Sequence, residues 1–231
     1  MVILGLQKTT LLDYPNKLAS TIFTGGCNFK CPYCHNRDLV IPPKDALSYS
    51  LKEIFDHLNA KKKVLDGVCI TGGEPTLHKD LPDFIKAIKD LSLLVKLDSN
   101  GTNPDMISYL LDNHLVDYIA MDIKHSKSKY NSIASMPNFD INPICDSVDI
   151  LKKSSIDYEF RTTLMKECHD SSDIEDIGKW LSGAKAYYLQ SYKESEQVIN
   201  PIFSPHSKET LLSFVDILIP YVPNTHLRGI D

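Results

Sequence analysis

The sequence predicts an α/β fold built on a parallel sheet, because short apolar segments with strand character alternate with amphipathic segments of helical periodicity along its 231 residues. Six segments have the length and composition of strands, and they span residues 18–24, 68–71, 94–97, 118–123, 158–164 and 186–192. Right-handed crossovers between parallel strands allow either an open sheet or a partial barrel, and periodicity alone does not choose between them. No low-complexity linker divides the series, so we expect residues 1–231 to form one domain.

The segments between these strands carry the signals of helix starts. Four such signals are present, namely the capping-box pairs Ser50 with Glu53 and Ser172 with Glu175 and the Asn-Pro pairs at 103–104 and 142–143. Apolar residues at helical spacing predict further helices over 81–91 and 211–219. The polar connection 125–140 is long for a compact domain, and we expect it to face a substrate.

Composition and charge argue against two classes of partner. Hydrophobic residues make up 42% and charged residues 24% of the chain, values typical of a soluble globular protein. The net charge of −5 argues against broad nucleic-acid binding, which requires many cations facing phosphates. No apolar stretch approaches the roughly 18 residues of a membrane span, and residues 1–15 lack the long apolar core of a secretory signal. We therefore expect a cytoplasmic protein that binds neither nucleic acid nor membrane.

Three cysteines directly after the first predicted strand are the strongest chemical signal. Cys27, Cys31 and Cys34 form a C-x3-C-x2-C pattern within eight residues, so their thiolates can face one point. Three thiolates are one fewer than tetrahedral iron or zinc requires, and an iron-sulfur cluster held in this way keeps one iron open to a further ligand. A structural zinc site would need a second cysteine or histidine pair, which the sequence lacks, and a disulfide framework is typical of short secreted chains. The remaining cysteines, Cys69, Cys145 and Cys168, are widely spaced and are expected to be small buried hydrophobes.

This cysteine pattern resembles the signature of the radical S-adenosylmethionine enzymes, and CHN at 34–36 is similar to the glycyl-radical-enzyme activases. The opening GLQKTTLLDYPNKLASTIFTGGCNFKCPYCHN, from Gly5, most closely resembles the activating protein of anaerobic ribonucleoside-triphosphate reductase. The likeness continues through TGGEPTL, LVKLDSNG, VDYIAMDIK and YEFRTTL, so it covers nearly the whole chain. The resemblance implies a partial (β/α)6 TIM-like barrel whose three cysteines hold a [4Fe-4S] cluster.

The resemblance also implies a reaction and its partners. S-adenosylmethionine would be cleaved reductively at the cluster, and the resulting 5′-deoxyadenosyl radical would take a hydrogen atom from a glycine Cα. That glycine would belong to a glycyl-radical enzyme, the anaerobic ribonucleotide reductase. The chain carries no second cysteine cluster, so it is similar to the short activases, which would draw electrons from flavodoxin or ferredoxin.

Polar residues follow the predicted strands at the end where a parallel fold collects its ligands. In chain order these are Gly72, Gly73 and Glu74, then Asp98, Ser99 and Asn100, then Asp122 and Lys124, and finally Arg161 and Gln190. The glycines would let a ligand approach the backbone closely. The carboxylates of Asp98 and Asp122 lie within or beside apolar runs, where an unpaired charge is costly, so we expect a cation beside them. Arg161 lies within a predicted buried strand and needs an anionic partner, for which the carboxylate or ribose of the cofactor is a candidate.

The resemblance implies roles for several of these residues. The GGEP motif that contains Glu74 would hold the amino group of the methionine moiety. Asp98, Ser99 and Asp122 would bind S-adenosylmethionine and could hold a monovalent cation near its carboxylate, which Lys124 would meet. The alternatives are that Glu74 is a solvated turn carboxylate and that a buried Asp-Lys pair only locks the barrel.

A further group of residues keeps an ordinary alternative beside the functional one. By the resemblance, Tyr33 would lie near the adenine and contact it through its backbone. Gln190 and Tyr192 could reach the adenosine, although a core position is the ordinary role of such a tyrosine. His35 and Asn36 could pack beside the cluster or the substrate, or could begin a helix.

Three functions are compatible with these residues. The first is an activase of a glycyl-radical enzyme, and the second is a radical S-adenosylmethionine enzyme that modifies a small molecule or a peptide. The third is a non-catalytic iron-sulfur or zinc binding module, which would leave the polar residues at the strand ends without a role. The first accounts for the most residues.

Overall fold

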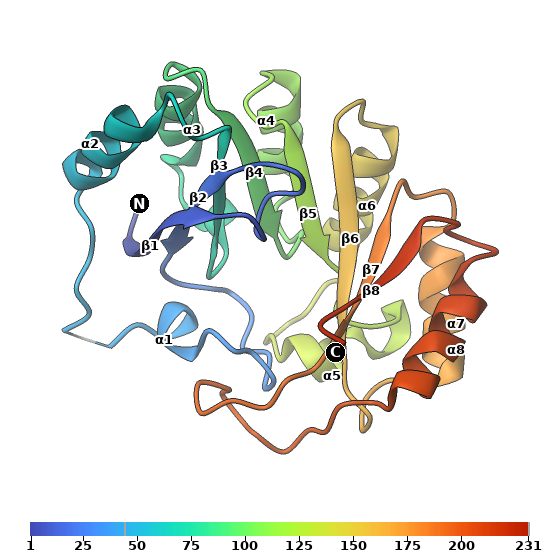
Figure 1. The fold of residues 1–231 in the computed structure, drawn as a ribbon. Coiled ribbons are helices and arrows are strands. Elements are labelled where there is room, and N and C mark those ends of the chain that lie inside the picture. The colour runs from blue at the N-terminus through green and yellow to red at the C-terminus, as the bar shows by residue number, and fades with distance from the viewer. Residues whose placement is uncertain (44, 231) are drawn as a thin grey trace.

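The computed structural model describes residues 1–43 and 45–230, which form a curved eight-stranded sheet with helices on its outer side (Figure 1). The strands are β1 (Ile3–Thr10), β2 (Ala19–Thr24), β3 (Gly67–Gly72), β4 (Leu94–Ser99), β5 (Tyr118–Asp122), β6 (Asp157–Leu164), β7 (Tyr187–Ser191) and β8 (Thr225–Arg228). They lie in sequence order, and all neighbouring pairs are parallel except β1 with β2. Within the described ranges β1 and β8 do not pair, so the sheet is an open, partial TIM-like barrel.

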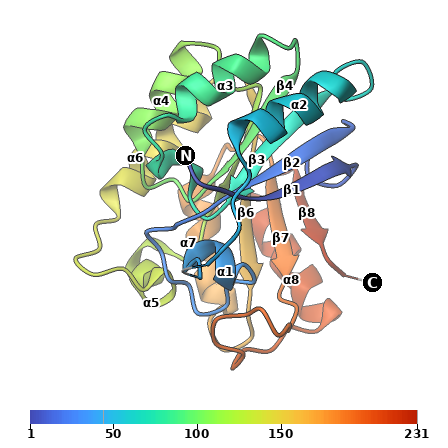
Figure 2. The ribbon, with the colours of Figure 1, turned by 90° about the vertical axis from the view of Figure 1, so that its left-hand side faces the viewer.

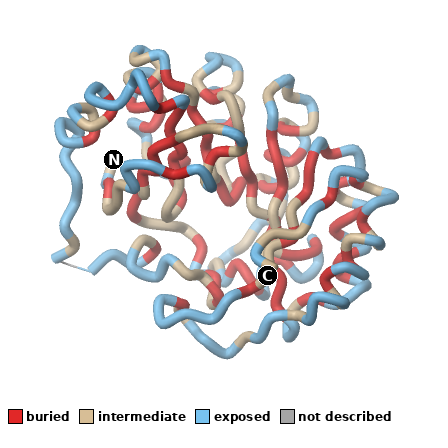
Figure 3. Tube along the Cα trace, viewed as in Figure 1, coloured by how far each residue is buried: buried red, intermediate tan, exposed pale blue. Residues whose placement is uncertain are grey.

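Helices accompany this sheet, most of them on its outer side (Figure 1 and Figure 2). They are α1 (Arg37–Val40), α2 (Leu51–Lys61), α3 (Leu81–Lys89), α4 (Pro104–Asp112), α5 (Tyr130–Ala134), α6 (Asn142–Lys153), α7 (Ser171–Leu181) and α8 (Lys208–Leu218), with short 3-10 helices η1 (Pro75–Leu77) and η2 (Lys127–Lys129). Figure 2 shows α2, α3, α4 and α6 along one side of the sheet, whereas α1 and α5 lie at one end of the strands. Figure 3 shows that burial follows the strands and the inner faces of the helices. No helix within residues 1–43 and 45–230 is long and apolar enough to cross a membrane.

The six predicted strands correspond to β2–β7, and the predicted fold class is confirmed. The edge strands β1 and β8 were not predicted. Residues 11–18, which join β1 to β2, lack the two-residue turn signal of a tight hairpin, and β8 has only four residues. Both strands are defined by their pairing with β2 and β7, because strand formation at an edge depends on the neighbouring strand more than on intrinsic preference.

Two of the four predicted helix starts are confirmed. Ser50 and Glu53 make both hydrogen bonds of the capping box at α2. The Asn103 side chain accepts a hydrogen bond from the Met106 backbone N–H at 3.2 Å and caps α4. Local sequence signals therefore determine where these two helices begin.

The other two predicted starts are wrong. The Asp170 side chain caps α7 by accepting hydrogen bonds from the backbone N–H groups of Ser172 and Asp173, so the predicted cap Ser172 lies inside the helix. A carboxylate is favoured there because the helix N-terminus carries partial positive charge. Asn142 is already the first residue of α6, and the Asp140 carboxylate accepts a hydrogen bond from its N–H at 3.0 Å.

An ion pair inside the barrel holds the edge strand β8. Glu159 on β6 is fully buried and accepts hydrogen bonds from Arg228 Nη1 at 2.5 Å and Nη2 at 2.8 Å. The Tyr118 hydroxyl donates to the same carboxylate at 2.7 Å, and the Arg228 guanidinium lies 3.4 Å from the centre of the Tyr188 ring. This two-point pairing fixes β8 because it constrains both distance and orientation.

We predict that Arg228→Met lowers the free energy of unfolding by about 3 kcal/mol, because it leaves the buried Glu159 carboxylate without its cation. Urea unfolding followed by circular dichroism measures this loss. The double variant Arg228→Met with Glu159→Gln should recover part of the stability, since the unpaired charge is then absent. Equal stability of Arg228→Met and the wild type would contradict the assignment.

Candidate active site

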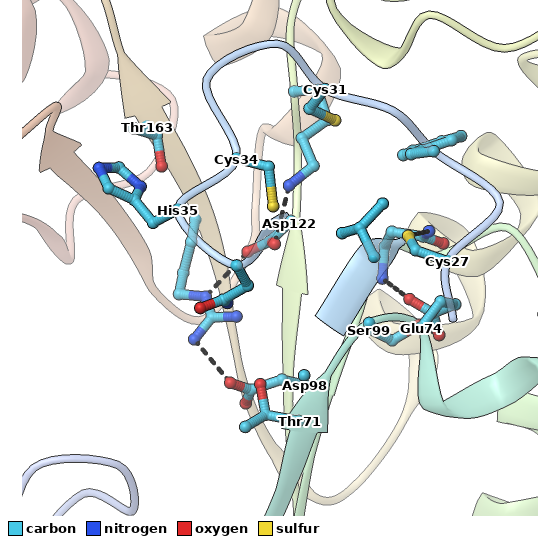
Figure 4. A pocket seen from close by; sticks show the side chains of 18 of the residues that line it. Cys27, Cys31, Cys34, His35, Thr71, Glu74, Asp98, Ser99, Asp122 and Thr163 are labelled. Atoms are coloured by element: carbon cyan, nitrogen blue, oxygen red, sulfur yellow. Dashed lines mark hydrogen bonds and ion pairs between the residues drawn. The ribbon is translucent and has the colours of Figure 1, made fainter. Parts of the chain in front are cut away.

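A cavity of about 270 Å³ lies where the parallel strands β2–β7 end, and Figure 4 shows the side chains in its wall. All residues predicted for the site line it, namely Cys27, Cys31, Tyr33, Cys34, Gly72, Gly73, Glu74, Asp98, Ser99, Asn100, Asp122, Lys124, Arg161 and Gln190. Residues without a predicted role also line it, and these are Phe29, Val40, Thr71 and Thr163. The fold thus brings the ends of six strands to one place.

The three motif cysteines lie on the loop after β2 and are free thiols. A turn closed by the Cys34 N–H and the Cys31 carbonyl at 3.0 Å bends the loop over the cavity. Burial raises the pKa of the Cys27 thiol to about 12 and that of Cys31 to about 11. Since metals bind thiolates, binding of iron at this loop must displace protons.

Segments far apart in the sequence support the cysteine loop from both sides. Phe29 packs against Tyr130 and Phe139, each with a centroid distance of 6.5 Å, and the Lys30 N–H donates to the Ala134 carbonyl at 3.2 Å. Residues 125–140 support the cysteine loop and do not line this cavity, and their expected position facing a substrate stays a prediction.

The second support comes from the segment after β7. The Asn200 N–H donates to the Pro32 carbonyl at 2.7 Å, and the Ile199 N–H donates to the Cys34 carbonyl at 3.2 Å. Sequence analysis missed this segment because backbone hydrogen bonds of this kind leave no pattern in residue types.

Glu74 joins the ends of β3 and β4. Its carboxylate is 1% exposed and accepts hydrogen bonds from the Asn100 N–H at 2.6 Å, the Ser99 hydroxyl at 2.9 Å and the Thr76 N–H at 3.1 Å. Burial raises the pKa of this carboxyl group even though these hydrogen bonds oppose the shift. Glu74 is therefore not a solvated turn residue, and much of its hydrogen-bonding capacity serves the fold.

The glycines before Glu74 allow β3 to approach the cysteine loop. A Cβ atom on Gly73 would lie 2.0 Å from the Gly26 carbonyl oxygen, and Gly72 has a φ of +116°. The Glu74 N–H donates to the same Gly26 carbonyl at 2.8 Å. Glycine is thus required at residue 73 because a side chain would block the packing of its backbone against Gly26, whether or not a ligand binds.

Asp98, Asp122 and Arg161 form the charged floor of the cavity. Arg161 donates from Nη1 to Asp98 at 3.1 Å and from Nε to Asp122 at 3.0 Å, while Lys124 donates to Asp122 at 2.9 Å and Lys96 contacts Asp98. Burial opposes ionisation, but the charges of Lys124 and Arg161 outweigh it and lower the pKa of Asp122 to about 2. The protein thus supplies carboxylate partners for Arg161 and basic side chains beside Asp98 and Asp122, while the predicted cofactor contact and monovalent cation stay predictions.

Residues 21–181 match the family described as the Radical SAM superfamily. The chain belongs to this superfamily. The matched region contains the cysteine loop and the polar ends of β3, β4 and β5.

The radical SAM chain is similar over most of its length to two proteins of Methanocaldococcus jannaschii whose names describe candidate glycyl-radical enzyme activating enzymes. One is 34% identical over 98% of this chain and 95% of that protein. The other is 30% identical over 88% of this chain and 78% of that protein. The chain is also 28% identical to the 7-carboxy-7-deazaguanine synthase of Thermoplasma acidophilum, over 59% of this chain and 62% of the synthase.

Solved structures share the fold at low sequence identity. Streptococcus suis SuiB, solved with the precursor peptide SuiA, has a TM-score of 0.72 and 14% identity over 90% of this chain. The match covers 48% of SuiB, so this chain spans about half the length of that protein. TYW1 with a lysine-pyruvate adduct has a TM-score of 0.63 and 17% identity, over 88% of this chain and 74% of that one.

The cofactors of a radical SAM enzyme of this kind are a [4Fe-4S] cluster and S-adenosylmethionine, and the cavity fits both. Three free thiols on one loop match a cluster with one open iron. The Tyr33 hydroxyl is buried in the cavity wall, and no hydrogen-bond partner for it exists among the described residues, so a polar ligand atom could satisfy it. Lys124 and Arg161 offer positive charge for a carboxylate.

Four residues near the cavity differ in position. The cavity is lined by Gln190, His35 and Asn36. Asn36 is also the residue that precedes α1 at its N-terminus. Tyr192 is 1% exposed, does not line the cavity and packs against His35 with a centroid distance of 5.5 Å. The alternative of a core tyrosine therefore applies to Tyr192.

A stacked histidine pair behind the radical SAM site positions Lys124. The rings of His125 and His169 lie 4.7 Å apart, and both residues are buried. His169 Nδ1 accepts a hydrogen bond from the Met165 N–H at 3.3 Å, so its Nε2–H can donate to the Lys124 carbonyl at 3.1 Å. Burial and the neighbouring His125 lower the pKa of His169 to about 4. No sequence motif indicated this pair.

We predict that Glu74→Gln destabilises the protein by about 2 kcal/mol, because the amide places a donor among the N–H and hydroxyl donors that the carboxylate now accepts. Chemical unfolding of the cluster-free protein measures the change. The matched control is Glu196→Gln, on an exposed loop, which should leave stability unchanged. A neutral Glu74→Gln would show that the carboxylate does not hold the strand ends.

We predict that His169 makes stability fall with acidification. Because its folded pKa of about 4 lies below its ordinary value of 6.5, the unfolded state binds the proton more readily, and stability is lost as pH falls from 6.5 to 4. The loss attributable to this residue is on the order of 3 kcal/mol.

The variant His169→Gln tests this directly, since an amide N–H can still donate to the Lys124 carbonyl but does not titrate. Its unfolding free energy should depend less steeply on pH than that of the wild type over this range. The exposed His226→Gln serves as the control and should keep the wild-type slope. Parallel pH profiles for His169→Gln and the wild type would contradict the role of His169.

Proposed function

We propose that this radical SAM enzyme activates a glycyl-radical enzyme, and that its partner is the anaerobic ribonucleoside-triphosphate reductase. The observation that carries the activase role is similarity at 34% identity over 98% of the chain to a candidate activase, together with the three-cysteine loop over the cavity. The choice of the reductase rests on the resemblance of the segment from Gly5 through the CHN motif.

The cofactors supply the reactive chemistry, since the cluster and S-adenosylmethionine, when bound, provide a 5′-deoxyadenosyl radical by reductive cleavage of a carbon-sulfur bond. The protein then has to bind and orient the two cofactors and to protect the radical. Cys27, Cys31 and Cys34 hold the cluster, and Lys124 with Arg161 orients the carboxylate of the methionine moiety. Both basic groups are held in place by Asp122, which limits the orientations open to the ligand.

The other predicted residues complete the cofactor site in this proposal. The backbone of the segment 72–75 meets the amino group, and Ser99 and Asn100 close the same side of the cavity. Tyr33 and Gln190 meet the adenosine. Burial of much of the cavity wall limits the access of other hydrogen-atom donors, which would otherwise quench a carbon radical.

An electron donor and a compartment follow from the same proposal. The described cysteines outside the loop, Cys69, Cys145 and Cys168, lie on separate elements or loops, so we propose flavodoxin or ferredoxin as the external donor. Free thiols that serve as cluster ligands suit a reducing cytoplasm. We also propose that residues 1–231 act as one domain.

The proposed function predicts a glycyl radical on the partner. The protein, reconstituted with iron and sulfide without oxygen and then reduced, should generate a glycyl radical signal in electron paramagnetic resonance when mixed with S-adenosylmethionine and the reductase. Cys31→Ala should abolish the signal because it removes a cluster ligand. The matched control Cys145→Ala, on α6, should retain it.

The outcomes separate the candidate functions. Formation of 5′-deoxyadenosine without a glycyl radical would reject the activase role. This result would favour the second candidate function, an enzyme that modifies a small molecule. The similarity to 7-carboxy-7-deazaguanine synthase also supports that candidate. Binding of one zinc ion, with no spectral response to S-adenosylmethionine, would reject both.

A further inference from the structure

The two aspartates on the cavity floor have all four carboxylate oxygens beside a basic side chain. Asp98 Oδ2 is 3.1 Å from Arg161 Nη1, and Asp98 Oδ1 contacts Lys96 Nζ. Asp122 Oδ1 is 3.0 Å from Arg161 Nε, and Asp122 Oδ2 is 2.9 Å from Lys124 Nζ. A free metal cation near these aspartates would therefore compete with basic groups that are covalently part of the chain.

Lys96 is the unexpected member of this group. It lies two residues before Asp98 on β4, so both side chains point to the same side of the sheet. Its side chain is 3% exposed, and Nζ also lies 3.7 Å from Cys69 Sγ and 6.0 Å from the centre of the Tyr118 ring. Its ammonium group therefore contacts Asp98, Cys69 and Tyr118 inside the barrel.

Lys96 reaches Asp98 from the side of the barrel away from the cysteines. It lines a separate cavity of about 160 Å³ that also borders Leu12 and Asp13 on the connection between β1 and β2. Asp98 and Arg161 line both cavities, whereas Lys96 does not line the one that contains the cysteines. The ammonium thus occupies one side of Asp98 and leaves the cofactor side open.

The five side chains that contact one another here carry a net positive charge, while Asp13, Glu159 and Arg228 also border the cavity that Lys96 lines. Lys96, Lys124 and Arg161 carry three positive charges against two negative charges on Asp98 and Asp122. Addition of a free cation would raise the excess from one positive charge to two, in a region where charges are poorly screened. Addition of a carboxylate would instead bring the group to neutrality.

We propose that Lys96 is a built-in cation that takes the place of a free monovalent metal ion beside Asp98 and Asp122. The sodium or potassium ion considered from the sequence does not fit this site. The inference rests on the proposed cofactor role of the cavity but not on the identity of the partner enzyme. It accounts for a buried lysine that has no other evident role in the site.

The test is the ion dependence of cofactor binding. For the cluster-loaded wild type, the dissociation constant of S-adenosylmethionine, measured by calorimetry, should change by less than about twofold when KCl or NaCl replaces tetramethylammonium chloride at equal ionic strength. The thermal midpoint of the cluster-free protein should likewise not depend on which of these cations is present.

Removal of the ammonium should create an ion requirement. In tetramethylammonium chloride, Lys96→Met should weaken S-adenosylmethionine binding by about tenfold or more, and KCl should restore it, because Asp98 then lacks one cation. The matched control Lys89→Met removes a lysine whose Nζ lies 2.7 Å from Asp117 and which lies outside the cavity. It should gain no dependence on potassium.

Each outcome of these measurements supports or refutes the proposed role of Lys96. A potassium or sodium requirement in the wild type would refute the inference alone, and so would Lys96→Met that binds equally well in every salt. Should Lys96→Met fail to fold, the wild-type ion series still decides, and Lys96→Gln repeats the variant test. Absence of S-adenosylmethionine binding in every salt would refute the proposed cofactor site and the inference with it.

Discussion

Arg161 bridges Asp98 and Asp122, and the arrangement of the cavity depends on this shared guanidinium. Its two contacts tie β4, β5 and β6 together at the end where the cysteine loop lies. Removal of any member would leave a poorly solvated charge without its partner, so the group is stable only as a whole. Together with Lys96 and Lys124, these residues carry three positive charges against two negative charges in a chain whose net charge is −5, which favours an anionic group of a ligand at this point.

The cysteine loop has a different kind of support. It contains little regular structure of its own, and it is held by Phe29 against the segment around α5 and by backbone hydrogen bonds to residues 199 and 200. Gly73 allows β3 to meet the loop backbone at Gly26. Three thiols can therefore be presented at defined positions before any metal arrives, which lowers the conformational entropy lost when a cluster binds.

Buried polar residues behind the cavity also hold its wall in place. The His125–His169 pair fixes the backbone at Lys124, and Glu74 joins the ends of β3 and β4. In each case a buried polar group has its hydrogen bonds satisfied by neighbouring strand ends, and so it holds two elements at once. Positioning of the cofactor groups is thus distributed over residues that do not themselves meet a ligand.

The sequence by itself determined the six central strands, the fold class and a large part of the cavity wall, whereas Phe29, Val40, Thr71 and Thr163 were not predicted. Strand and helix periodicity are local, and strand ends of a parallel fold meet at one place, so Cys27, Asp98 and Arg161 could be brought together before any coordinates were known. Only the tertiary structure decided the edge strands β1 and β8, the cap at Asp170 and the support of the cysteine loop by residues 125–140. It also decided that Lys96 stands beside Asp98. These features depend on partners distant in the chain or on competition between nearby caps, and neither leaves a periodic signal in residue types.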